Sequence, residues 1–127
     1  MTDMVFVANV NQTWDDVARK MLHKSLHHIV IVDENHTPVG MASVSDLLAH
    51  YVNNQARNLH RTLGESFEQA GHAPKLYTVD KDSRLFDAAH LMDIHHVQCL
   101  PVIDERRRLL GVITPTDIMR SMLEASA

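Results

Sequence analysis

Residues 109–119 read LLGVITPTDIM, in which an apolar run meets a polar turn and then further apolar residues. The first five residues favour a buried strand, because Val and Ile suit a pleated environment. Thr114 is a suitable N-cap for a following helix, and Pro115 suits the first helical position. Asp117 places a carboxylate in the first turn, where the helix dipole favours it. The stretch therefore predicts a strand that leads directly into a helix.

A second copy of this pattern, VGMASVSDLL, occupies residues 39–48. The two halves align without a gap when each residue is paired with the one 71 positions later, as Asp33 is with Asp104. Further identical pairs are Asp16 and Asp87, Ala18 and Ala89, Met21 and Met92, Glu34 and Glu105, Gly40 and Gly111, and Asp46 and Asp117. The chain is therefore a tandem repeat of one unit.

Length and composition limit the classes of function. The chain has 127 residues, of which 45% are hydrophobic, and this suffices for one compact domain. Each half alone would have a small interior, so we expect the two repeats to share a core. The net charge of −4 and the pI near 6.2 argue against nucleic acid or an anionic membrane as the main partner.

Two further features concern location and cysteine chemistry. No apolar run approaches the ~20 residues that span a bilayer, and the first residues do not resemble a secretory signal. We therefore expect a cytoplasmic location. Cys99 is the only cysteine, which excludes an internal disulfide and a zinc site built on paired thiolates. We expect it to be a small buried thiol.

Each repeat is expected to have the order β-α-β-β-α, which is an α/β fold of the α+β kind. Residues 1–62 form the first repeat with the start of the connector, and residues 63–127 form the second repeat with its lead-in. The expected strands are residues 5–8, 29–32, 39–42, 76–79, 100–103 and 109–113. The expected N-caps are Thr13, Ser43, Ser83 and Thr114. The expected inward-facing residues of three helices are Trp14, Val17, Ala18, Met21 and Leu22; Leu85, Ala88, Ala89 and Met92; and Ile118, Met119, Met122 and Leu123.

Both halves resemble the CBS domain, the cystathionine-β-synthase type of regulatory repeat, two of which form a Bateman module. The sequence LPVID at residues 100–104 is similar to the family's hydrophobic-Pro-Val-Val-Asp strand. Residues 111–117 are similar to its Gly-hydrophobic-x-Thr/Ser-x-x-Asp signature, whereas Val30 stands where the family often has proline. The resemblance implies two tandem repeats packed as a pseudo-twofold pair. Met1-Thr2 resembles only the end of the family's lead-in, so we expect a larger parent protein.

The polar residues of each strand-to-helix turn suit a ribose. An ionised Asp accepts hydrogen bonds from vicinal hydroxyls, and Ser or Thr can donate or accept. In the family these positions bind the ribose and neighbouring phosphate of adenine nucleotides in the cleft between two repeats, and apolar strand residues enclose the base. The resemblance therefore implies as ligand-binding residues Thr78, Asp80, Leu100, Pro101, Thr114, Thr116, Asp117 and Arg120, together with Ala8, Asn9, Ile29, Val30, Ser43 and Asp46.

The spacing of the turn residues has a second interpretation. Ser/Thr-x-x-Asp is close to an ordinary capping box, which stabilises a helix by about 1 kcal/mol without any ligand. Both roles therefore stay open, and the assignment of a ligand rests on the resemblance. The second turn, Thr114 to Asp117, carries the fuller motif.

Cations that would hold a phosphate are unevenly placed. Arg106 to Arg108 lie in a predicted hairpin turn, where a solvated charge run is the simpler interpretation, whereas Arg120 lies one turn beyond Asp117. His27-His28 and His95-His96 precede the second strand of each repeat, where the family often has basic residues, and histidines there can sense pH.

The ten histidines do not predict a metal site. His23 and His27 have a helical i, i+4 spacing, but no Glu completes a His-Glu-x-x-His arrangement. His27 also lies where the first helix is expected to have ended.

The leading hypothesis is a regulatory module in which AMP, ADP, ATP or S-adenosylmethionine shifts the repeats and biases an attached or partner effector. The alternative is a ligand-free dimerisation unit whose helices pair through exposed apolar faces, with Met119, Met122 and Leu123 among them. An enzyme has little support, because the sequence has no nucleophile elbow and no phosphate-binding glycine loop. We expect a homodimer, no catalytic residue and no required cofactor.

Overall fold

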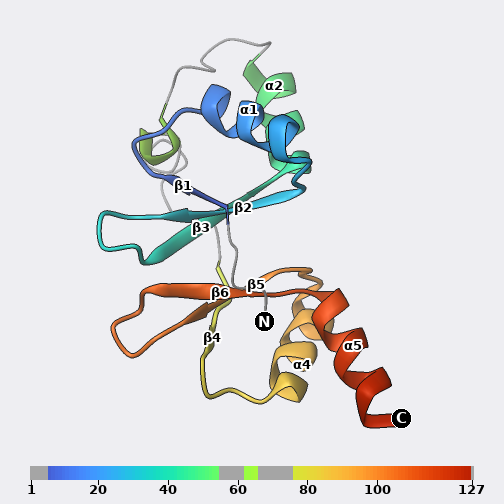
Figure 1. Cartoon of the computed structure of the whole chain (residues 1–127). Coiled ribbons are helices and arrows are strands. Elements are labelled where there is room, and N and C mark those ends of the chain that lie inside the picture. Colours follow the sequence, from blue (N-terminus) through green and yellow to red (C-terminus); the bar gives the residue numbers. More distant parts are fainter. Residues whose placement is uncertain (1–5, 55–61, 66–75, 127) are drawn as a thin grey trace. The chain divides into compact units, whose positions relative to one another are not determined.

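The computed structural model describes residues 6–54, 62–65 and 76–126. Contacts divide the chain into two compact units, with the division after Leu76. The first unit contains β1 (Val7–Asn9), α1 (Trp14–Lys24), β2 (His28–Val32), β3 (Pro38–Ser43) and α2 (Val44–Asn54). The second contains β4 (Val79–Asp80), α4 (Leu85–His95), β5 (Leu100–Ile103), β6 (Leu109–Ile113) and α5 (Pro115–Ser126) (Figure 1). The order β-α-β-β-α is confirmed in both units.

The two sheets have the same topology. In the first, β1 pairs parallel with β2, and β2 pairs antiparallel with β3. In the second, β4 pairs parallel with β5, and β5 pairs antiparallel with β6. Parallel neighbours need a crossover, which α1 and α4 supply. Within each unit, the two helices lie on the same face of the sheet (Figure 1).

Internal symmetry extends to irregular backbone. A register shift occurs between Ile31 and Val32 in β2, and again at the aligned residues Val102 and Ile103 in β5. Left-handed backbone closes α1 at Ser25 and α4 at His96, which lie 71 positions apart. The β2–β3 and β5–β6 turns each use one further left-handed residue, His36 and Arg107. The repeat therefore keeps conformation even where the residue types differ.

Most predicted strands match the structure, and the differences lie at the first strand of each unit. β5 and β6 have the predicted bounds. The strand predicted at residues 76–79 is reduced to Val79–Asp80, because only these two residues pair with β5. β1 begins at Val7, and residue 5 of the predicted strand lies outside the described residues.

The predicted caps are correct at three helices and wrong at the fourth. Thr13 forms a full capping box with Asp16, and α2 and α5 begin directly after Ser43 and Thr114. The prediction of Ser83 is wrong, because α4 begins at Leu85 and has Arg84 as its N-cap without a side-chain capping bond. Arg84 instead donates from Nε to the Asp87 carboxylate, over 3.3 Å.

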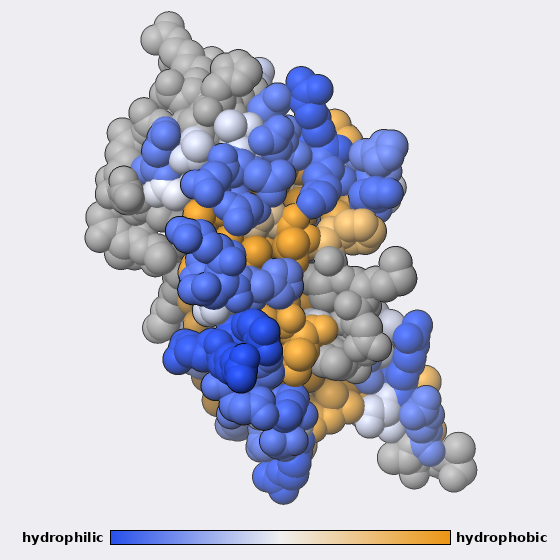
Figure 2. Space-filling model, turned by 60° about the vertical axis from the view of Figure 1, so that its left-hand side comes forward, coloured by the Kyte–Doolittle hydropathy of each residue, from blue (hydrophilic) through white to orange (hydrophobic). Residues whose placement is uncertain are grey.

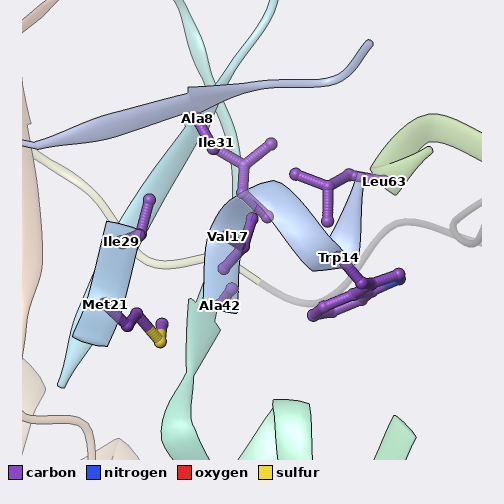
Figure 3. Packing of buried hydrophobic residues seen from close by; sticks show 8 residues of the cluster. All are labelled: Ala8, Trp14, Val17, Met21, Ile29, Ile31, Ala42 and Leu63. Atoms are coloured by element: carbon purple, nitrogen blue, oxygen red, sulfur yellow. The ribbon is translucent and has the colours of Figure 1, made fainter. Parts of the chain in front are cut away.

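The core of the first unit lies between its sheet and its helices. Trp14, Val17 and Met21 of α1 are buried against strand residues (Figure 3). Ala18 is partly buried, but the prediction that Leu22 faces inward is wrong, since it is 83% exposed. The buried members of the cluster are Ala8, Trp14, Val17, Met21, Ile29, Ile31, Ala42 and Leu63.

Leu63 belongs to this first core although it follows α2. Its backbone N–H donates to the Gln12 carbonyl over 2.9 Å, and the Gly64 N–H donates to the Val10 carbonyl over 2.9 Å. Its side chain extends toward Trp14 (Figure 3) and is 0% exposed. The compact units, which are defined by contacts, divide after Leu76, while the expected repeat boundary between residues 62 and 63 stays a prediction.

The second unit has a hydrophobic cluster of its own, and the shared core that the small size of each half predicts stays a prediction. Ala88 and Met92 of α4 are buried in it, and Leu85 and Ile118 pack at its edge. The prediction that the other apolar residues of α5 face inward is wrong: Met119 is 54%, Met122 63% and Leu123 72% exposed. In the described residues, no helix is long and apolar enough to cross a membrane.

Candidate functional site

The first candidate turn joins β3 to α2. The Ser43 N–H donates to Asp46 Oδ2 over 2.8 Å, and the Asp46 N–H donates to Ser43 Oγ over 3.1 Å. Two reciprocal bonds of this kind define a capping box. Asp46 is exposed, and within the part of the chain that the structure describes, its second carboxylate oxygen accepts no hydrogen bond. The turn therefore fixes a carboxylate that can still accept hydrogen bonds from a ligand.

The second candidate turn joins β6 to α5. Asp117 Oδ2 accepts from the Thr114 N–H over 2.9 Å and from the Thr114 hydroxyl over 3.3 Å. Pro115 is the first residue of α5, as predicted. Asp117 and Arg120 line a cavity of about 300 Å³ together with Leu85, Ser121 and Glu124. Carboxylate, guanidinium and hydroxyl groups therefore meet beside this turn, whereas Thr116 is exposed on α5.

The same hydrogen-bond pattern also occurs at α1, which follows neither candidate turn. The Thr13 N–H donates to Asp16 Oδ2 over 3.1 Å, and the Asp16 N–H donates to Thr13 Oγ1 over 3.2 Å. The geometry of Ser43 and Asp46 is therefore what a helix cap requires, with or without a ligand.

The polar residues of the first strands lie at the other end of each sheet. Asp80 pairs with Ile103, whereas Leu100, at the opposite end of β5, pairs with Ile113 beside the second turn. Three residues of strand span roughly 10 Å. Asp80 lines a separate cavity of about 300 Å³, with Lys81, Asp82, Ile103, Asp104 and Glu105. The structure therefore does not bring Asp80 to Thr114 and Asp117; Thr78, two residues before it, is half-buried.

A similar separation holds in the first unit. Asn9 pairs with Val32, and Ala8 pairs with Ile31, at the hairpin end of β2. The Asn9 N–H donates to Gln12 Oε1 over 2.7 Å, and Asn9 Oδ1 accepts from the Asn11 N–H over 2.9 Å. Asn9 is thus used to shape its own loop, while Ala8 is buried in the core.

The apolar residues expected around a base are buried. Ile29 and Leu100 belong to the cores of their units. Val30 and Pro101 follow them, so they point to the sheet face opposite the helices, and both are buried as well.

Among the basic residues, Arg108 is engaged within its own turn. Its Nε donates to Asp104 Oδ2 over 3.3 Å, and Asp104 Oδ1 also accepts from the backbone N–H groups of Arg106 and Arg108. These bonds hold the pKa of Asp104 below its usual value, the backbone bond from Arg108 being the largest cause. In the described residues, no group of three or more His, Cys, Asp or Glu side chains could hold a metal ion.

His28 lies beside the first turn in the sheet. It begins β2 and pairs with Ser43 of β3. Burial lowers the pKa of His28, His27 lowers it further, and Asp46 opposes this shift. Burial raises the pKa of the Cys99 thiol to about 11, and Asp117 adds to the shift.

Sequence reasoning missed an apolar groove in the first unit. The groove, of about 350 Å³, lies between α1 and α2, and its lining residues are Ala18, Met21, Leu22, Leu26, Val44, Leu47, Leu48 and Tyr51. The sequence does show that α2 and α5 both carry apolar faces, because their apolar residues align at the offset of 71. The periodicity of these residues does not show that the faces stay exposed.

Comparisons with known proteins agree with the division of the chain into two repeats. A family model described as "CBS domain" matches residues 1–53 and residues 72–124. The uncharacterised protein MK0525 of Methanopyrus kandleri is 26% identical over 116 residues, which are 91% of this chain and 57% of that protein. The L-aspartate semialdehyde sulfurtransferase of Methanosarcina acetivorans is 27% identical over 120 residues, which are 94% of this chain and 22% of that protein. The chain thus spans only part of these relatives.

Two solved structures share the fold over almost the whole chain. CBSX2 in complex with AMP is 25% identical, with a TM-score of 0.78, and the match covers 97% of this chain and 90% of that one. The CBS domain pair of protein MJ0100, in complex with 5′-methylthioadenosine and S-adenosyl-L-methionine, is 21% identical, with a TM-score of 0.75. That match covers 98% of this chain and 93% of the other, and at this identity it shows the fold alone.

Proposed function

Since the chain belongs to the CBS domain family, we propose that it is a regulatory module that binds an adenine nucleotide at its strand-to-helix turns and controls an attached or partner effector. The observation that carries the proposal is the likeness to CBSX2, which was solved with AMP. AMP is therefore the first ligand to test, followed by ADP, ATP and S-adenosylmethionine.

The geometry of the turns supports a ribose as the recognised group. A carboxylate oxygen accepts hydrogen bonds from hydroxyls, and bonds to a charged acceptor are stronger than neutral ones. At the first turn, one oxygen of Asp46 bonds to Ser43, and the exposed position of Asp46 leaves the other within reach of solvent. Capping and ligand binding can thus use different oxygens of the same side chain.

The experiment is a thermal-shift titration of the chain with each ligand, with and without magnesium. A ligand present at about 100 times its dissociation constant should stabilise the fold by about 2.7 kcal/mol. For a chain of this size we expect a rise in Tm of several degrees. No shift with any of these ligands would contradict the proposal.

Variants separate binding from capping. Thr114→Ala combined with Asp117→Ala should remove most of the nucleotide affinity of the second turn and lower stability by about 1 kcal/mol through the lost cap. Asp16→Ala is the matched control, because Asp16 makes the same kind of capping bonds at α1, which follows neither turn. It should cost similar stability and leave the ligand-induced shift unchanged. Equal shifts in both variants would show that the site is misplaced.

The proposed role contains no catalytic step and no required cofactor. The cytoplasmic location stays a prediction. A hydrolysis assay with the same nucleotides tests whether the chain has a catalytic activity. Turnover that is lost on Asp117→Asn, in a variant that still folds, would contradict it.

A second candidate role, dimerisation, is favoured by one observation. Three exposed apolar residues of α5, Met119, Met122 and Leu123, align at the offset of 71 with three exposed apolar residues of α2, Leu48, Tyr51 and Val52. Apolar residues also reach the surface among hydrophilic ones in the space-filling view (Figure 2). Because contiguous exposed apolar residues often mark interaction sites, we propose that these helices contribute to a homodimer.

A further inference from the structure

The two turns differ at one aligned position beside them. His28 begins β2, and its partner in the sheet is Ser43, which forms the capping box with Asp46. The residue 71 positions later is Cys99, directly before β5, whose first residue pairs with Ile113 at the end of β6. Both side chains are only partly exposed.

Each of these side chains interacts with the carboxylate of its own turn. Asp46 acts on the charge of His28, and Asp117 acts on that of Cys99. The other group that acts on His28 is His27, the residue before it, while its β3 neighbour Ser43 carries no charge. Position 28 and its counterpart at 99 are therefore electrostatically coupled to the residues that would hold the ligand.

At a second aligned position, the second unit has the cationic residue and the first unit has an uncharged one. Arg120 lines the cavity beside Asp117, and the residue that aligns with it in α2 is Ala49. Arginine keeps its charge at every pH at which proteins fold, whereas histidine gains and loses its charge near neutrality. The second turn thus has a permanent cation and the first turn a titratable one.

We propose that His28 makes the binding of an anionic ligand at the first turn dependent on pH, whereas Cys99 and Arg120 leave the second turn without this dependence. The inference rests on the proposed function of the same turns. A protonated imidazole beside Asp46 offsets the negative charge of that carboxylate and attracts a phosphate. In the neutral form of His28, the uncompensated carboxylate repels a phosphate. At the second turn a neutral thiol cannot act in this way.

The test uses two variants of the full chain, each with one intact turn, and AMP as the probe. Asp117→Ala leaves the first turn, and Asp46→Ala leaves the second. Calorimetric titrations at about pH 8 and about pH 5 span the range in which histidine changes its charge, and the lower limit allows for the lowered pKa of His28. Uptake of one proton strengthens binding by at most about tenfold per pH unit. The Asp117→Ala protein should therefore gain affinity on acidification relative to the Asp46→Ala protein, and the titration of AMP itself cancels in this comparison.

Reciprocal exchanges at the aligned position sharpen the test. His28→Cys in the Asp117→Ala protein should remove the extra pH dependence, and Cys99→His in the Asp46→Ala protein should introduce one. The circular dichroism spectrum of each variant checks that it is folded. Identical pH profiles of AMP affinity in all four proteins would overturn this inference and leave the proposed function unaffected. Failure of AMP to bind the unmodified chain at every pH would overturn the proposed binding of AMP, and the inference with it.

Discussion

Asp16, Asp46 and Asp117 all accept a hydrogen bond from the backbone N–H three residues earlier. Their local geometry is alike, so the hydrogen bonds alone do not mark a ligand site. What differs is the surroundings: Asp46 and Asp117 follow the last strand of a sheet, and Asp16 follows the loop after β1. At the scale of single residues, position in the fold rather than hydrogen-bond geometry distinguishes a candidate ligand residue from a helix cap.

Cys99 gives a prediction at the same scale. Burial raises its pKa to about 11, so at about pH 8 very little of the folded protein carries the reactive thiolate. Iodoacetamide should therefore modify the native chain slowly and the urea-unfolded chain fast. Mass spectrometry of the labelled chain measures both rates. Rapid labelling of the native chain would show that the thiol is more accessible than in the structure, in which Cys99 is half-buried.

The same shift gives the sign of a pH effect on stability. The pKa of the thiol is higher in the folded chain than in the unfolded one, so folding favours the protonated form. The contribution of Cys99 to stability is full below its pKa in the unfolded chain, about 8.5, and falls as the pH rises toward 11. Cys99→Ala should reduce the loss of stability over this alkaline range.

At the scale of elements, the chain after α2 completes the first core. Leu63 is fully buried in the same cluster as Trp14. Its neighbour Thr62 forms an isolated β-bridge with Thr13, and the Gly64 N–H donates to the Val10 carbonyl. Residues 62–64 thus pack at the start of α1, about 50 positions earlier in the chain. The first unit depends on residues that follow α2.

Substitution of Leu63 tests this dependence. Leu63→Ala should lower the free energy of unfolding by about 2–5 kcal/mol, because it leaves a cavity in a packed core. Leu22→Ala is the matched control, since the same atoms are removed from a residue that is largely exposed, and should change stability by less than about 0.5 kcal/mol. Urea denaturation measures both. Similar small effects would show that residues 62–65 do not complete the core.

At the scale of the whole molecule, the exposed apolar residues of α2 and α5 predict self-association. We expect the chain to sediment as a homodimer, because burying such residues removes apolar surface from water. Met119→Glu with Leu123→Glu should shift the chain toward monomer. Leu110→Glu is the control, because Leu110 is an exposed apolar residue of β6 rather than of a helix. A strictly monomeric unmodified chain in sedimentation velocity would contradict the prediction.

The sequence by itself determined the repeat, the order of elements and the two turns. These are local properties: alternating or helical spacing of apolar residues, a cap such as Ser43, and an offset of 71 that needs no knowledge of contacts. The matching left-handed residues Ser25 and His96 show that aligned positions also share backbone conformation. Ser83 is the local failure, since a capping residue type does not by itself fix where a helix begins.

Only the tertiary structure decided which apolar faces are buried and which residues lie beside each turn. Leu22 and Met119 have the spacing of core residues, yet both are exposed, because no described segment covers them. Leu63 lies in a polar stretch and is nevertheless buried. The pairing of β2 with β3 brings His28 to the first turn, and strand direction puts Asp80 away from the second. Periodicity shows that a face is apolar, but burial depends on a partner that is distant in sequence, and that partner is fixed only when the chain folds.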